Sequence, residues 1–132
     1  MEPIKVIVRY VNGKVIKGFT QNFSPNKNRF HLHPAGKTSG EVVEVQMKDL
    51  KAVFYVRDFV GNAQYQEQKH SVETKTPGQK VEVTFMDGEV LVGSTLSIDP
   101  ERLGFFLFPA DPKGNNVKVF VVTSAVEEAR FL

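Results

Sequence analysis

The sequence predicts an all-β protein built from two tandem five-stranded small barrels that arose by internal duplication. The first observation is a repeat: residues 5–35 align without a gap on residues 80–110, and twelve of these 31 positions are identical. The second is turn chemistry, since Asn12-Gly13 and Asp87-Gly88 interrupt alternating apolar residues at equivalent places, a strong short-range signal for a β-hairpin. The third is the regular spacing of short strand-like segments, which favours a barrel because closure leaves no unpaired edge.

Each copy contains five expected strands separated by turn residues. The first two form the hairpin, and Gly18 and Gly93 fall in the middle of the second strand, where a residue without Cβ allows a sharp bend. Pro25 and Pro100 then turn the chain. The remaining strands are expected at 29–33, 42–48 and 51–57 in the first copy and at 103–108, 117–122 and 125–131 in the second.

The repeat divides the chain into three parts. Residues 1–59 form the first barrel repeat, residues 60–78 a polar linker and residues 79–132 the second barrel repeat. The fourth strands align with a one-residue slip that places residues 43–47 on residues 117–121. We expect the loop before the fourth strand to have absorbed this slip.

Composition restricts the class of protein. Of the 132 residues, 41% are hydrophobic and 24% are charged, which are ordinary values for a globular chain. Cysteine is absent, so neither a disulfide framework nor a thiolate metal site is available. No apolar run approaches the roughly 18 residues of a membrane span. We therefore expect a cytoplasmic protein without a membrane contact or a cofactor.

Charge is distributed unevenly between the copies. Residues 1–59 carry ten Lys or Arg against five Asp or Glu, whereas residues 79–132 carry five against eight. A basic half beside an acidic half is compatible with three interpretations: an anion-binding surface on the first copy, two halves that attract each other or a neighbouring chain, or drift of surface residues without a function.

The basic part of the first copy supplies a candidate anion-binding site. His31 and His33 stand two apart on one expected strand, so both side chains point to the same face. A histidine pair could chelate a metal ion, but no further ligand is placed by its spacing, and we predict no metal site. Four basic residues stand nearby in the sequence. Together with the pair they form the candidate anion site, which consists of Lys14, Lys17, Lys27, Arg29, His31 and His33.

The outer face of the second copy supplies a candidate interface. Phe30 and Leu32 are identical to their counterparts in the second copy, Phe105 and Leu107, so these positions are expected to face the core. The residues between them then point outward. By this parity the outer face of the second copy carries Phe106, Phe108, Phe120 and Val122. An apolar cluster of this size implies coverage by the first copy, the linker or a second chain, and a homodimer is the preferred expectation.

With these motifs in place, each copy resembles the Sm-like fold, also described as an SH3-like small barrel. The resemblance rests on the hairpin dipeptide, the glycine within the second strand and residues 124–128 (SAVEE) before the last strand. It implies RNA binding by an Asp and an Asn four residues apart; Asp99 is followed by Leu103 and Ser24 by Asn28, so each copy keeps half of that pair. Residues 105–112 (FFLFPADP) also resemble an uncharacterised family of bacterial domains without an assigned activity.

The sequence predicts a binding protein and not an enzyme. A phosphate loop, a nucleophile elbow and a paired-carboxylate site are missing from the sequence. The leading interpretation is a non-enzymatic binding or scaffolding protein that acts through protein contacts. Nucleic-acid binding by the basic first copy is the alternative. A weaker one is cyclic-dinucleotide binding, because residues 22–27 are faintly similar to the Asn-x-Ser-x-x-Gly stretch of PilZ-type barrels.

Overall fold

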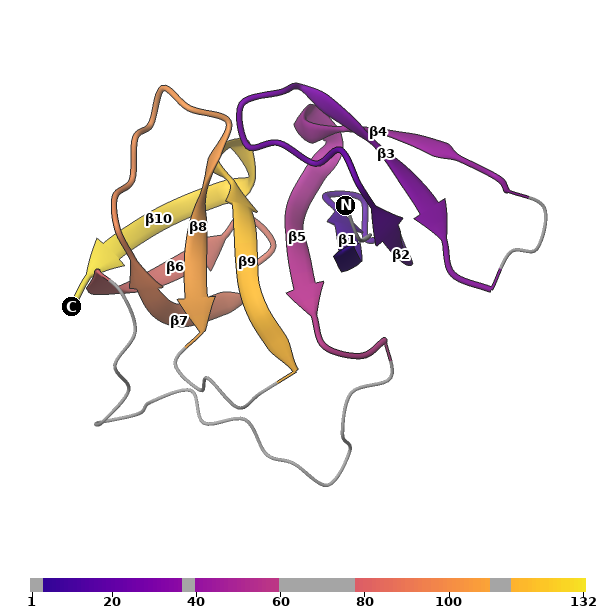
Figure 1. Ribbon diagram of the computed structural model, residues 1–132. Coiled ribbons are helices and arrows are strands. Elements are labelled where there is room, and N and C mark those ends of the chain that lie inside the picture. The colour runs from indigo at the N-terminus through magenta and orange to yellow at the C-terminus, as the bar shows by residue number, and fades with distance from the viewer. Residues whose placement is uncertain (1–3, 37–39, 60–77, 110–114) are drawn as a thin grey trace.

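The computed structural model describes residues 4–36, 40–59, 78–109 and 115–132, and the regular secondary structure of these residues is almost entirely β-strand (Figure 1). This confirms the all-β prediction. The first repeat contributes β1 (Ile4–Tyr10), β2 (Val15–Thr20), β3 (Arg29–Pro34), β4 (Val43–Gln46), the single-turn 3-10 helix η1 (Met47–Asp49) and β5 (Leu50–Val56). The second contributes β6 (Gln79–Phe85), β7 (Val90–Thr95), β8 (Gly104–Pro109), β9 (Asn116–Val122), η2 (Thr123–Ala125) and β10 (Val126–Phe131).

The strands form one antiparallel sheet with the order β10-β6-β7-β8-β9-β5-β1-β2-β3-β4. Within it the first repeat reads 5-1-2-3-4 and the second reads 10-6-7-8-9, so the two halves have the same topology. They join where β5 pairs with β9, and in Figure 1 these two strands run side by side through the middle of the molecule. We call this pairing and the side chains around it the junction.

The prediction of two closed barrels is not confirmed. The described strands form an open sheet that ends at β10 on one side and at β4 on the other. Each strand has two edges, and β5 uses one for β1 and the other for β9. The edge of β5 that would face β4 in a closed first repeat is therefore occupied by the second repeat.

The hairpin turns match between the repeats bond by bond. Gly13 and Gly88 have φ angles of 94° and 93°, a region that favours glycine. Asn12 Oδ1 accepts a hydrogen bond from the amide two residues later at 2.9 Å, and Asp87 Oδ1 does the same at 2.9 Å. The predicted equivalence of the two turns is confirmed.

Gly18 and Gly93 mark a close approach of backbones. A Cβ on Gly18 would lie 2.5 Å from the carbonyl oxygen of His33, and one on Gly93 would lie 2.3 Å from that of Phe108. These contacts are shorter than any side chain tolerates, so the second strand of each repeat can meet the third only at a glycine.

The register corrects the alignment of the C-terminal strands. Phe30 pairs with Val45 in the first repeat, and the equivalent Phe105 pairs with Val121 in the second. Val45 therefore corresponds to Val121 and not to Val119. The indel between the repeats is one residue long, as predicted, but it lies in the opposite direction, so that strands four and five are offset by 76 residues.

Two apolar cores lie on either side of the junction, and each takes side chains from both repeats. The eight positions predicted to be buried are buried: Val6, Val8, Phe30, Leu32, Val81, Val83, Phe105 and Leu107. Ala52 and Phe54 of β5 belong to the core of the second repeat, whereas Phe120 and Val122 of β9 belong to the core of the first. The strands at the junction are thus covered on both faces.

Two further predictions concern the linker and a possible membrane span. Positions 60–77 of the predicted linker lie outside them. Among the helices of the described residues, none is long and apolar enough to cross a bilayer.

Candidate binding groove

The candidate interface residues divide into two groups. Phe120 and Val122, which are 0% and 2% exposed, pack within the core of the first repeat. Phe106 is half-buried against the same core. Phe108 is also half-buried, but it lies further along β8 and lines a surface hollow. Most of the predicted outer aromatic face is therefore covered by the first repeat of the same chain. Phe108, at one end of it, lines the surface hollow instead.

Aromatic rings from both repeats meet edge to face across the junction. The ring centroid of Phe106 lies 5.2 Å from that of Phe120 and 5.9 Å from that of Tyr55. Phe23, from the turn after β2, contacts the same rings at 5.3 to 6.5 Å. Perpendicular rings at these separations are the favoured geometry for aromatic pairs. We call the four residues Phe23, Tyr55, Phe106 and Phe120 the aromatic shelf.

Lys118 of β9 lies on the open side of the aromatic shelf. Its Nζ is 4.4 Å from the ring centroid of Phe106 and 4.8 Å from that of Tyr55, within cation–π range. Burial raises the pKa of the Tyr55 hydroxyl to about 12, so Tyr55 stays neutral over the physiological range. The shelf therefore combines an apolar floor with one positive charge.

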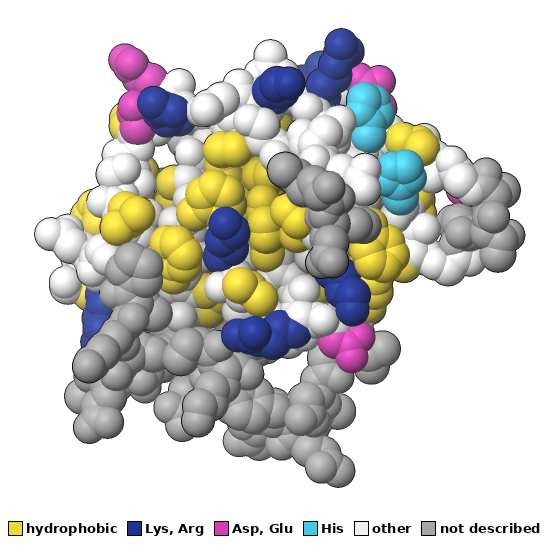
Figure 2. Space-filling model, in the orientation of Figure 1, with side chains coloured by type: hydrophobic (Ala, Val, Ile, Leu, Met, Phe, Trp, Pro, Cys, Tyr) yellow, Lys and Arg dark blue, Asp and Glu magenta, His cyan; other side chains and the backbone are white. Residues whose placement is uncertain are grey.

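A groove of about 450 Å³ continues from the shelf along β7 and β8. Its walls include Thr95, Leu96, Asp99, Arg102, Phe106 and Phe108. Leu96 is 73% exposed, and Thr95 Oγ1 donates a 2.8 Å hydrogen bond to the carbonyl of Phe106, which ties the groove wall to β8. Figure 2 shows hydrophobic side chains gathered on this face over β8, β9 and β5, with basic side chains among them.

The surface of the first repeat that is equivalent to this groove carries most of the candidate anion site. The offset of 75 residues that relates β3 to β8 places His31 at the position of Phe106 and His33 at that of Phe108. Lys27 likewise corresponds to Arg102. The two candidate sites are thus the same surface in the two repeats, with phenylalanines on the strand of one and histidines on the strand of the other.

Three members of the candidate anion site share the exposed side of β3. Arg29, His31 and His33 alternate with the buried Phe30 and Leu32. Arg29 Nη1 pairs with Glu44 at 3.1 Å, so its charge is partly neutralised. His31 Nδ1 lies 2.9 Å from the side-chain nitrogen Nδ2 of Asn22.

The other two lysines of the candidate site make different contacts. Lys17 Nζ donates to the carbonyl of Phe59 at 3.0 Å, and Lys14 Nζ lies 5.7 Å from the ring of Tyr10. Within the described residues, no group of three or more His, Asp or Glu side chains could hold a metal ion. The predicted site is therefore best described as a basic strip on β3 with Lys27 in the preceding turn.

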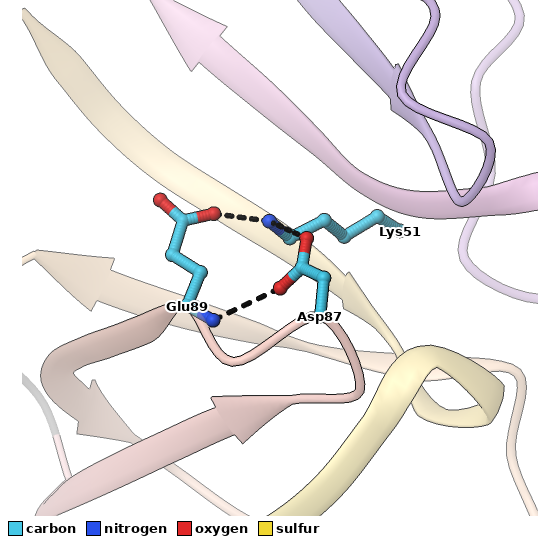
Figure 3. Close-up of polar contacts among 3 residues, drawn as sticks. All are labelled: Lys51, Asp87 and Glu89. Atoms are coloured by element: carbon cyan, nitrogen blue, oxygen red, sulfur yellow. Dashed lines mark hydrogen bonds and ion pairs between the residues drawn. The ribbon is translucent and has the colours of Figure 1, made fainter.

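The sequence interpretation missed a charged cluster that connects the repeats (Figure 3). Lys51 of β5 is buried, and its Nζ hydrogen-bonds Asp87 Oδ2 at 2.7 Å and Glu89 Oε1. Burial opposes the charge of Lys51, but the two carboxylates outweigh it and raise its pKa. The hydrogen bond from Lys51 lowers the pKa of Asp87. The equivalent residue of the second repeat is Glu127, so the internal repeat does not single out Lys51 in the sequence.

These features define a tandem-repeat, all-β protein with a groove of mixed apolar and polar lining beside its junction. A family of unknown function (DUF6982) matches residues 2–132, and the chain belongs to that family. No curated protein and no solved structure matches the chain. Membership agrees with the predicted resemblance to an uncharacterised domain family, whereas the resemblance to the Sm-like fold stays a prediction.

Proposed function

We propose that this protein is a non-enzymatic binding or scaffolding protein that holds an extended segment of another protein in the groove of its second repeat. The groove itself is the observation that carries the proposal. It is about 450 Å³ in volume and is lined by half-buried and exposed apolar side chains, of which Leu96 is 73% exposed. Exposed apolar surface that is concave and bordered by polar groups is typical of a binding site.

The charges around the groove favour a particular kind of segment. Arg102 stands in its wall, and Lys118 lies over the aromatic shelf next to it. A peptide with an apolar residue for the groove and an acidic residue beside it would satisfy both features. Asp99 pairs with Arg102 at 3.7 Å, but both side chains are exposed, so Arg102 can still contact an acidic residue of a bound peptide.

The basic strip on β3 supports the second candidate function, nucleic-acid binding by the first repeat. Its side chains are exposed, and they occupy the surface equivalent to the groove. Phosphate contacts by such a strip would weaken steeply with salt, whereas apolar burial in the groove would not.

A matched pair of variants separates the two functions. Phe108→Ser removes an apolar wall of the groove, and His33→Ser makes the same change at the equivalent position of the first repeat. The probes are fluorescein-labelled extended peptides with Leu, Phe, Ala or Ser beside an acidic residue, and a single-stranded oligouridylate. Binding is measured by fluorescence anisotropy at low and high salt.

We expect the Leu and Phe peptides to bind, and Phe108→Ser to weaken them about tenfold, equivalent to roughly 1.4 kcal/mol. His33→Ser should leave peptide binding unchanged. If only the oligonucleotide binds, and His33→Ser or high salt abolishes that binding while Phe108→Ser does not, the protein-binding proposal is wrong and the nucleic-acid function replaces it.

A further inference from the structure

The junction between the repeats is a template for contacts at the two open edges of the sheet. In the junction, the last strand of one repeat pairs with the fourth strand of the next. The sheet ends at β10, which is again a last strand, and at β4, which is again a fourth strand. The open edge of β10 is therefore equivalent to the edge of β5 that pairs with β9. The open edge of β4 is equivalent to the edge of β9 that pairs with β5.

The charged cluster of the junction reappears across these edges with its signs reversed. Lys51 occupies a β-bulge on β5, and the equivalent bulge on β10 is occupied by Glu127. The partners of Lys51, Asp87 and Glu89 in the hairpin turn of the second repeat, correspond to Asn12 and Lys14 in the first. In the junction Lys51 faces two carboxylates. At the open edges the equivalent Glu127 of one molecule would face Lys14 and Asn12 of the next, so the two charges are again opposite but exchanged.

A second polar contact of the junction shows the same complementarity. Arg102 Nη1 donates to Asn26 Oδ1 at 2.9 Å across the two turns that flank the junction. At the open edges the equivalent residues are Lys27 and Glu101. Opposite charges would again face each other.

The open edges also carry exposed apolar side chains at matching register positions. Tyr55 pairs with Lys118 in the junction. The equivalent residues at the edges are Phe131 and Val42, which are 49% and 48% exposed. Pairing of the edges would place these two side chains next to each other and remove both from water.

We infer that a second copy of this chain docks head to tail, with β10 of one molecule pairing with β4 of the next. Such a contact is heterologous: each molecule keeps one open edge after the other is used, so the association extends until a ring closes or the chain of molecules ends. This inference goes beyond the proposed groove function, because it uses different edges of the sheet.

The contact is weaker than the junction on which it is based. Phe120 and Phe54, which fill the two cores at the junction, correspond to Glu44 and Arg130 at the edges. With fewer apolar side chains to bury, the association depends on charge and on backbone hydrogen bonds. It should therefore be concentration-dependent and sensitive to salt.

Reversal of the charges tests the contact by sedimentation velocity at low and high salt. Lys14→Glu and Glu127→Lys should each abolish self-association, because like charges would face each other in every contact. An equimolar mixture of the two variants should associate again, since each open edge then finds a complementary one. Restored association also shows that both variants are folded. Lys17→Glu, the same charge change on an exposed residue away from the edges, should associate like the native protein.

Cross-linking tests the direction of pairing. The chain has no cysteine, so Val42→Cys and Phe131→Cys each introduce one thiol at an exposed position. Under mild oxidation a mixture of the two should form a disulfide-linked pair, and neither variant alone should do so. A mixture that does not cross-link, or a native protein whose mass does not change with concentration at low salt, overturns the inference. Self-cross-linking of Phe131→Cys overturns the head-to-tail arrangement, because it requires two β10 edges to meet.

Discussion

β5 and β10 are equivalent strands with opposite surroundings. β5 is buried on both faces except at the half-buried Tyr55, whereas most side chains of β10 are exposed. Both strands pair with the first strand of their own repeat, but only β5 is covered on its other edge. The two repeats therefore share the pairing of their backbones. Their side chains differ according to whether a neighbouring strand covers the edge: they are mostly apolar in β5, and half of them are charged in β10.

The largest expected effect comes from the fourth strands of the two repeats. Phe120→Ala should lower the free energy of unfolding by about 3–5 kcal/mol, because Phe120 is fully buried in the junction and its loss leaves a cavity. The matched change Glu44→Ala at the exposed equivalent position should alter it by less than about 0.5 kcal/mol. Urea unfolding monitored by circular dichroism measures both. Equal effects would mean that the two strands do not differ in burial.

An intermediate effect is expected at the bulge residues. Lys51→Met removes the cation that holds Asp87 and Glu89 and should lower the free energy of unfolding by about 1–3 kcal/mol. Glu127→Met at the equivalent exposed position should change it by no more than about 0.5 kcal/mol. Urea titrations of both variants at neutral pH test this difference, and a Lys51→Met variant as stable as the native protein would show that the cluster does not hold the repeats together.

The same cluster gives the junction a dependence on acid. The hydrogen bond from Lys51 lowers the pKa of Asp87 below its ordinary value of 3.8, so the stabilisation is fully present above that value. It is lost as the pH falls through the lowered pKa, because the folded protein must then take up a proton that the unfolded chain has already bound. Thermal unfolding between neutral and acidic pH should show this loss in the native protein and a flatter profile in Lys51→Met. Parallel profiles for the two proteins would remove Asp87 from the explanation.

A smaller effect is expected at high pH from Tyr55. Burial raises the pKa of Tyr55 to about 12, whereas a tyrosine in the unfolded chain ionises near pH 10. The contribution of Tyr55 is therefore present below about pH 10 and is lost as the pH rises through about 12. Tyr55→Phe should reduce the alkaline loss of stability and remove the phenolate transition near pH 12 from an ultraviolet titration. An unchanged titration would place that transition on another tyrosine.

The smallest effect is expected at the exposed face of β10. Arg130 pairs with Glu82 at 3.0 Å, but both side chains contact solvent, so Arg130→Ala should alter the free energy of unfolding by about 0–1 kcal/mol. The equivalent Phe54→Ala in β5 should cost about 3–5 kcal/mol, because Phe54 packs in the core of the second repeat. Denaturant titrations of the two variants compare a strand at the end of the sheet with one inside it.

Much of the fold within each repeat could be predicted because its signals are local. The hairpin dipeptides Asn12-Gly13 and Asp87-Gly88 fix both turns, and alternation identifies Phe30 and Leu32 as core residues. The internal repeat then carries each assignment to the other copy. These predictions depend only on residues close together in the sequence.

The contacts between the repeats could not be predicted in the same way. Pairing of β5 with β9 connects residues 60 to 69 positions apart in the sequence, and no periodicity specifies which edge a strand selects. The position of the candidate groove could be predicted in part from the sequence, since Phe106 and Phe108 were expected to face outward. The role of Lys51 could not be predicted, because it depends on a bulge that turns the side chain toward the other repeat.

The exchange of strands between the cores has a consequence for synthesis of the protein. The core of the first repeat includes Phe120 and Val122, which leave the ribosome well after the first five strands. A nascent chain that carries only the first five strands therefore exposes the aromatic rings of Phe23 and Tyr55 and the unpaired edge of β5 until β9 arrives. Folding of the N-terminal half is thus completed by the C-terminal half, and truncation anywhere before β9 should leave a chain prone to aggregation.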